Sequence, residues 1–240
     1  MKIVKEFSRF AEEYNHRNII QLEVAKHLVS MLSKKDYNKI LDLGAGSGAI
    51  YKSIISNSIS FEKFIAFDFS EEMLKFHPND EKVYLSCLDF NEKNVFKVYE
   101  NNEFDILLSS SALQWSENLS SVLESISRLS KKYYLSFFTS NTFLTLHQIA
   151  NIKSPIYSKD SIEQALSLYF NYTIETVKYK LDFDSVQEMF RYIKRSGVSG
   201  GSGKLSYKEV KVLMNNYPLT YLEFEVVFIK AIPKVLPDIN

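Results

Sequence analysis

The residues with the clearest chemical pattern form a glycine-rich turn in the first quarter of the chain. Residues 42–48 read Asp-Leu-Gly-Ala-Gly-Ser-Gly, between a short apolar strand and a predicted helix at 49–57. Glycines permit positive φ and let a ligand approach the backbone closely. Gly44, Gly46 and Ala49 also satisfy the G-x-G-x-x-G/A pattern of dinucleotide-binding loops. We therefore predict a ligand-binding turn rather than one that only tightens packing, and the turn alone leaves the ligand open.

Three carboxylates after successive predicted strands distinguish between the candidate ligands. Asp42 precedes the glycines, where it would repel a pyrophosphate but would attract a cofactor that carries an ammonium and a sulfonium. Asp68 follows about 20 residues later, as expected for a carboxylate that accepts two ribose hydroxyls. Asp89 follows the third strand, where it can accept the adenine amine, and Phe90 adds an aromatic ring beside it. The set favours S-adenosylmethionine over a nicotinamide dinucleotide.

Composition and charge exclude several classes of protein. The chain has 240 residues, of which 29 are basic and 29 acidic, so no bulk attraction to nucleic acid or to a membrane is expected. The single cysteine, Cys87, excludes an intrachain disulfide and a zinc site of paired cysteines, and we expect no metal. No signal peptide and no run of roughly 20 apolar residues is present. We expect a cytoplasmic monomer.

Strands and helices alternate through the first 140 residues, which predicts a parallel sheet with helices on both faces. The expected strands are 39–43, 64–67, 83–87, 104–109, 133–139, 172–183 and 222–232. The expected helical regions are 1–35, 49–57, the turn after Ser70, 117–130, 142–170 and 184–196. We predict a single domain over 1–240, with an N-terminal helical lid (1–35), a cofactor-binding core (36–140), a substrate lid (141–216) and a last strand and tail (217–240).

The core resembles the class I S-adenosylmethionine-dependent methyltransferases. The stretch 68–74, Asp-Phe-Ser-Glu-Glu-Met-Leu, is similar to their second motif, and the resemblance covers about 36–140. It implies a Rossmann-like fold with a seven-stranded, mostly parallel sheet and an antiparallel last strand. It also implies that the acid binds ribose and that the methionine lies beside adenine. The implied cofactor-binding residues in this core are Asp42, Gly44, Ala45, Gly46, Asp68, Phe69, Met73, Asp89, Phe90 and Ser110.

The whole chain further resembles one family of that class, the malonyl-acyl-carrier-protein O-methyltransferases of biotin synthesis. The similar segments are 7–14, 109–115, 146–148, 189–197 and 217–221. The resemblance implies that Tyr14 closes over the cofactor and that malonyl-acyl carrier protein is the partner. The substrate-binding residues implied or suggested by these segments are Gln114, Trp115, His147, Arg191, Lys194 and Tyr221. The family's common Pro-Gly-Gly before the fifth strand is Ser-Lys-Lys here, and 196–203 is unusually rich in Gly and Ser, which puts loop geometry in doubt.

The implied acceptor is a carboxylate, which is already ionised at neutral pH. It needs no general base, only alignment with the methyl group and a fixed cation to orient it. Arg191 has the planar fork for that role, and Lys194 follows one helical turn later. Both could equally be solvated helix cations. A basic patch for the acidic carrier protein is also expected around the Gly/Ser-rich stretch, from Arg191, Lys194, Arg195, Lys204, Lys208 and Lys211.

Three alternatives stay open at this point. The chain could be another small-molecule carboxylate methyltransferase of the same class, because only the C-terminal third argues for the carrier-bound substrate. It could be a methyltransferase-like binding module without turnover. A nicotinamide-dependent reductase is opposed by Asp42 and by the motif that contains Met73.

Overall fold

The chain folds around one seven-stranded sheet with the strand order β3-β2-β1-β4-β5-β7-β6. The computed structural model describes residues 18–92, 94–99, 101, 103–195 and 207–234. The strands are β1 (Asp36–Leu43), β2 (Ser60–Asp68), β3 (Val83–Cys87), β4 (Ile106–Ser110), β5 (Tyr133–Phe138), β6 (Phe170–Asp182) and β7 (Tyr221–Pro233). β1 to β5 are parallel, and β7 runs antiparallel to both of its neighbours. This confirms the predicted fold class.

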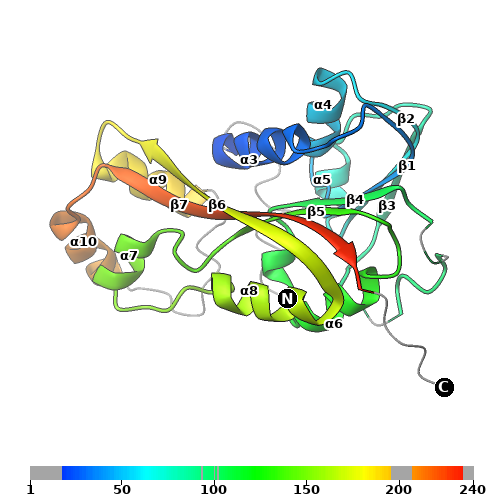
Figure 1. Cartoon of the computed structure of the whole chain (residues 1–240). Helices are drawn as coiled ribbons and strands as arrows, with labels where there is room; N and C mark the ends of the chain where they lie inside the picture. The colour runs from blue at the N-terminus through cyan, green and yellow to red at the C-terminus, as the bar shows by residue number, and fades with distance from the viewer. Residues whose placement is uncertain (1–17, 93, 100, 102, 196–206, 235–240) are drawn as a thin grey trace.

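Helices cover both faces of the sheet. They are α3 (Ile19–Ser30), α4 (Ala49–Ser56), α5 (Glu71–Leu74), α6 (Leu119–Ile126), α7 (Leu144–Ile149), α8 (Lys159–Tyr169), α9 (Val186–Arg195) and α10 (Tyr207–Asn216), with a short 3-10 helix at Leu113–Trp115. α3 and α4 lie on one face and α6 and α8 on the other (Figure 1). Apolar side chains of each face form a separate core layer, so the sheet is buried from both sides.

The burial of each strand follows its place in the sheet. Every residue of β5, which lies inside the sheet between β4 and β7, is buried. β6 lies at the edge and alternates between half-buried and exposed residues, which is the pattern of a strand with one solvated face. The beginnings of β1 and β2 alternate in the same way, because their pairing from Asp36 with Ser60 onward extends beyond the apolar run. The two strands therefore start earlier than the sequence pattern predicts.

The C-terminal half departs most from the sequence expectation. The region 142–170 is helical with an interruption around Pro155, as its sequence predicts, and forms α7 and α8, whereas α10 was not predicted at all. α7, α9 and α10 gather beside the end of β6 and the start of β7, beyond the carboxyl end of β5 (Figure 1). Across the described ranges, no helix combines the length and apolar character needed to cross a lipid bilayer.

Candidate functional site

A cleft lies at the carboxyl ends of β1, β2 and β4, where the order of strands along the chain reverses in the sheet. Ligands of open α/β sheets bind at such a switch point. The cleft contains about 740 Å³ of empty space, part of it open to solvent. Ten residues singled out from the sequence line it: Asp42, Gly44, Ala45, Gly46, Asp68, Phe69, Met73, Phe90, Ser110 and Trp115.

The glycine turn is held tightly against β2 and the segment after β4. The backbone N–H of Gly44 donates to the carbonyl of Phe67 at 2.7 Å, and that of Ala45 donates to the same oxygen at 2.9 Å. Gly44 has φ +80°, and a Cβ there would lie 2.2 Å from the Cβ of Ala112. A side chain is therefore excluded at Gly44 by both conformation and space, and the bare backbone forms one wall of the cleft.

Asp68 is fixed by the backbone and keeps capacity to accept further bonds. Its Oδ2 accepts from the N–H of Gly46 at 2.8 Å and its Oδ1 from the N–H of Ser70 at 2.9 Å. Burial raises the pKa of Asp68 to about 6, against the two backbone hydrogen bonds that lower it. Each oxygen retains a lone pair, so the carboxylate can accept the two hydroxyls of a ribose. Ser70 also caps α5, which carries Met73 into the cleft.

Asp42 is the most unusual group of the cleft. Its side chain is completely buried, and neither carboxylate oxygen has a hydrogen-bond partner among the residues that the structure describes. Desolvation, and then the charge of Asp68, raise the pKa of Asp42 well above its usual value. A buried carboxylate is costly unless a cationic donor reaches it. The ammonium group of S-adenosylmethionine supplies such a donor, so the residues present fit this cofactor.

The raised pKa values predict a pH dependence of cofactor binding. Asp42 attracts an ammonium and Asp68 accepts ribose hydroxyls most strongly when each is ionised, so we expect the Kd for S-adenosylhomocysteine to rise as the pH falls through the Asp68 pKa of about 6. Ligand-free stability should move in the opposite direction. An acid with a raised pKa binds protons more readily when folded, so the free energy of unfolding should increase as the pH falls from about 6 toward 3.8. Calorimetric titration and thermal unfolding across this range test both trends, and a constant Kd would contradict the first.

The end of β4 lines the cleft beside the glycine turn. Ser109 donates its hydroxyl to the carbonyl of Leu43 at 2.7 Å and so ties β4 to β1. Ser111 has φ +57°, and its buried hydroxyl has no partner within the described structure. Gln114 does not line the cleft but donates from Nε2 to the carbonyl of Ser111 at 2.7 Å. It holds the loop in which Ser111 and Trp115 face the cleft, and its predicted contact with substrate stays a prediction.

Asp89 follows β3, which ends at Cys87 as predicted, and its contact with adenine stays a prediction. The Oδ1 of Asp89 accepts from both the backbone N–H and the side-chain amide of Asn91 at 2.9 Å. Asp89 does not line the cleft, whereas its neighbour Phe90 does. The local turn with Asn91 uses an acceptor that the sequence pattern assigned to adenine.

Of the predicted substrate residues, Trp115 lines the cleft, whereas His147, Arg191 and Tyr221 lie apart from the lining. His147 is half-buried on α7, burial lowers its pKa, and its buried Nδ1 has no partner among the described residues. Arg191 is exposed on α9, and the ring of Tyr221 lies 4.0 Å from the Lys180 ammonium. Tyr14 and the Gly/Ser-rich stretch lie outside the described residues, and so does the side chain of Lys194. Their roles stay predictions.

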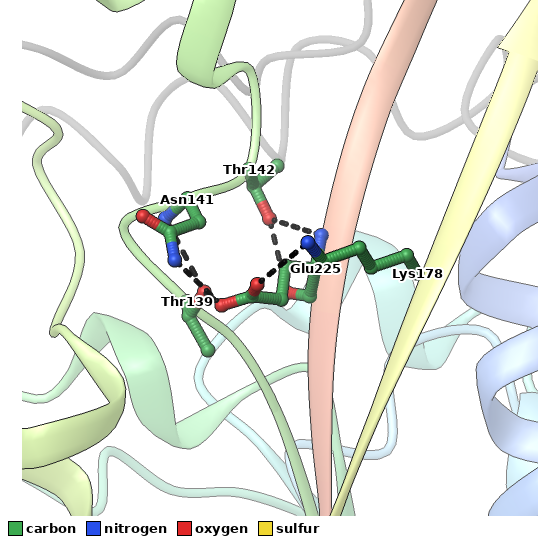
Figure 2. Close-up of polar contacts among 5 residues, drawn as sticks. All are labelled: Thr139, Asn141, Thr142, Lys178 and Glu225. Carbon is green, nitrogen blue, oxygen red and sulfur yellow. Dashed lines mark hydrogen bonds and ion pairs between the residues drawn. The ribbon is translucent and has the colours of Figure 1, made fainter.

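A buried carboxylate on β7, Glu225, was missed by the sequence interpretation. It accepts from the Thr139 hydroxyl at 2.7 Å and the Asn141 side-chain amide at 2.9 Å, and its other oxygen lies 3.9 Å from the Lys178 ammonium (Figure 2). Thr142 adds bonds to the backbone N–H and carbonyl of Glu225 (Figure 2). The cluster fixes the segment between β5 and α7. The available signal was an acidic residue within the predicted strand 222–232, which also contains Glu223.

Among the described side chains, no group of three or more His, Cys, Asp or Glu residues is placed to hold a metal ion. The polar groups that the described part of the cleft offers are its carboxylates, its glycine backbone and its buried polar atoms without partners.

Curated relatives cover most of the chain. Malonyl-[acyl-carrier protein] O-methyltransferase from Bacillus cytotoxicus is 25% identical over 220 residues, which are 82% of this chain and 76% of the relative. The protein of the same name from Neorickettsia risticii is 26% identical over 248 residues, 94% of each chain. The similarity thus extends beyond the cofactor core into the C-terminal third.

Solved structures share the fold at low identity. The YcgJ protein from Bacillus subtilis has a TM-score of 0.62 at 14% identity, over 88% of this chain and 97% of that one. A methyltransferase in complex with the Haloferax volcanii Trm112 activator has a TM-score of 0.64 at 15% identity, over 95% and 98%. Residues 34–191 match the family model of a methyltransferase domain. That match covers more than half of the chain and nearly all of the cleft, so the chain belongs to this family and is an S-adenosylmethionine-dependent methyltransferase.

Proposed function

We propose that this methyltransferase esterifies the free carboxylate of a malonyl thioester carried by acyl carrier protein, as the primer for biotin synthesis. One observation carries the proposal: among the described residues that line the cleft, the only ionisable side chains are Asp42 and Asp68. Both belong to the cofactor-binding set, so this lining offers no general base to an acceptor. A carboxylate is ionised at neutral pH and attacks without one.

The names of the relatives support the same acceptor. The curated proteins that match over most of the chain are malonyl-[acyl-carrier protein] O-methyltransferases. Their similarity includes the C-terminal third, which in this fold forms α9, α10 and β7. Identity near 25% supports a shared reaction type more strongly than a shared substrate. The acceptor is therefore the part of the proposal that needs a direct assay.

The bound cofactor supplies an electrophilic methyl group on its sulfonium. The chain's own residues have to orient the two reactants and keep water out. Asp42 and the backbone at Gly44 hold the cofactor at the β1–β4 wall. Trp115 and Ala112 line the same wall and contribute apolar surface near the predicted acceptor side. In-line placement of nucleophile and methyl is the main source of rate enhancement for such a transfer.

The acceptor side is proposed to lie beneath α7, α9 and α10. This region contains packed aromatic rings. Phe143 packs edge-on against Phe224 with 5.0 Å between the ring centroids, and Phe190 packs edge-on against Tyr217 with 5.6 Å between the centroids. An apolar layer of this kind suits a thioester and its acyl chain. We propose that residues 141–216 act as the substrate lid of a single domain. Arg191 on α9 and Lys211 on α10 are exposed cations on packed helices, as a docking surface for an acidic carrier protein requires.

The direct test supplies purified protein with labelled S-adenosylmethionine and, in separate reactions, malonyl-acyl carrier protein, malonyl-coenzyme A and free malonate. We expect a base-labile methyl ester on the carrier-bound substrate. Methylation of free malonate or of another small acid, with no ester on either thioester, would indicate a different carboxylate methyltransferase. Cofactor binding without transfer to any of them would contradict the proposed acceptor.

Arg191 is expected to orient the malonyl carboxylate. Arg191→Ala should lower kcat/KM for the carrier substrate by roughly 10- to 100-fold, because a hydrogen bond to a charged group contributes about 1.5–3 kcal/mol. Arg191→Lys should recover part of this loss, since the charge remains without the planar fork. Affinity for S-adenosylhomocysteine should not change in either variant.

The matched control for Arg191 is Lys131→Ala. It removes an exposed cation just before the amino end of β5, and the cleft lies at the carboxyl ends of the parallel strands. It should leave all kinetic constants unchanged. Steady-state kinetics with malonyl-acyl carrier protein check both variants. Equal turnover of Arg191→Ala and the unmodified enzyme would remove Arg191 from the mechanism.

A further inference from the structure

The residue that precedes helix α3 does not play the role that its type predicts. Asn18 occupies the N-cap position, where an asparagine side chain usually accepts a hydrogen bond from the first helical turn. Here no such bond forms. Asn18 is 4% exposed and lines the cofactor cleft, and its buried Oδ1 has no partner among the described residues. A capping residue that leaves its cap unmade and buries its oxygen needs another partner.

Gln21 repeats this arrangement one helical turn later. Residues three apart in a helix lie on the same face, so Gln21 and Asn18 are neighbours. Gln21 also lines the cleft, and within the described part of the chain its buried Oε1 has no partner. A buried amide oxygen that stays unpaired is unfavourable. Two of them on one face point to a ligand group that satisfies both.

The position of α3 shows which end of the cofactor they face. α3 packs on α4, β4 and β5. Asp68, Met73 and Phe90, which surround the adenosine end, come from β2 and the segments after β2 and β3. Asp42 lies near the carboxyl end of β1. In the sheet order β3-β2-β1-β4-β5, the strands that α3 contacts lie on one side of β1, and the strands that carry the predicted adenosine residues lie on the other. Asn18 and Gln21 therefore border the cleft on the side away from adenosine.

We propose that Asn18 and Gln21 bind the amino-acid end of S-adenosylmethionine and share its ammonium with Asp42. Among the described residues at this end, Asp42 leaves two oxygens unpaired and each amide leaves one, and the Ser111 hydroxyl on the β4 side is unpaired as well. A primary ammonium has three N–H donors and no acceptor, and carboxylate, amide and hydroxyl oxygens can all accept from it. Helix α3 thus becomes part of cofactor recognition, and the inference rests on the cofactor rather than on the proposed acceptor.

The amides should give selectivity for ligands that carry an amino-acid terminus. S-adenosylhomocysteine has this terminus, whereas 5′-methylthioadenosine contains the same nucleoside and a thioether without it. A residue that binds the terminus affects only the first ligand. A residue that merely supports the fold of the cleft affects both, so the ratio of the two affinities separates the two roles.

The test measures Kd for both ligands by calorimetry, without any acceptor present. Asn18→Ala and Gln21→Ala should each weaken S-adenosylhomocysteine by about 10-fold and leave 5′-methylthioadenosine within about 2-fold. Gln21→Met keeps the length and helix preference of the side chain and should behave like Gln21→Ala. Asn18→Ser keeps a good N-cap that is too short to reach the ligand, and it replaces Asn18→Ala if that variant does not fold.

Gln164→Ala is the matched control, because Gln164 is an exposed amide on α8, on the other face of the sheet. It should change neither Kd. Equal losses for both ligands in the Asn18 and Gln21 variants would overturn the proposal in favour of a structural role. Unchanged binding of S-adenosylhomocysteine would overturn it as well. Neither result depends on whether malonyl-acyl carrier protein is the acceptor.

Discussion

Replacing Asp42 with asparagine is expected to weaken S-adenosylhomocysteine binding by about 100-fold or more and to stabilise the ligand-free protein. Truncating or neutralising one partner of a buried charge pair costs about 2–5 kcal/mol. The asparagine is nearly isosteric, so the shape of the cleft is retained while the attraction for the ammonium is lost. Calorimetric titration measures this loss.

The gain in stability follows from the same burial. Asp42 is completely buried, both of its oxygens lack a partner among the described residues, and desolvation and Asp68 raise its pKa. Ionisation of Asp42 is therefore unfavourable in the folded, ligand-free chain, and a neutral amide does not carry this cost. A gain of about 1 kcal/mol would raise Tm by roughly 2–4 °C for a chain of this size. Function and stability should thus change in opposite directions.

Asp105→Asn is the matched control for Asp42→Asn. Asp105 lies at the start of β4, and its Oδ2 accepts from the backbone N–H groups of Asn38 at 2.6 Å and Lys39 at 3.1 Å. Its substitution should lower Tm and leave the affinity for S-adenosylhomocysteine unchanged. A lower Tm for Asp42→Asn would contradict its unfavourable burial, and an unchanged affinity would remove Asp42 from cofactor binding.

The cofactor core was predictable because its signals are local. The glycine turn at 42–48 needs positive φ, and the two strands beside it are short apolar runs, so type and spacing alone define the unit. Asp68 and Met73 follow within one strand and one capped turn. Residues this close in sequence are placed by backbone geometry, and the structure puts all of them in one cleft.

The remaining site residues depend on tertiary packing. Asn18 and Gln21 were not singled out, because only the packing of α3 on β4 and β5 turns their side chains into the cleft. Asp89 was assigned to adenine, yet a local bond with Asn91 competes for its oxygen. The placement of Arg191 depends on contacts of α9 with β7 and α10 that no local pattern encodes.

Glu225 was also not singled out from the sequence, and its substitution is expected to have a large effect on stability. Glu225→Ala should lower the free energy of unfolding by about 2–4 kcal/mol, because the buried Thr139 hydroxyl and the Asn141 amide lose a charged acceptor. Thr139 is completely buried, so water cannot replace the lost acceptor without opening the structure. The segment from β5 to α7 would loosen, and with it the packing of Phe143 on Phe224. Chemical denaturation measures the loss.

Two further variants separate hydrogen bonding from charge at Glu225. Both Thr139 and Asn141 donate to Oε1, and a glutamine retains that acceptor, so Glu225→Gln should cost less than about 1 kcal/mol. Lys178→Ala should be nearly silent, because its ammonium lies 3.9 Å from the carboxylate and its side chain is 81% exposed. A loss for Glu225→Gln as large as for Glu225→Ala would show that charge, not acceptor geometry, holds the segment. The cofactor cleft is built from β1, β2 and β4, so S-adenosylhomocysteine affinity should survive even in Glu225→Ala, which confines the damage to the proposed acceptor side.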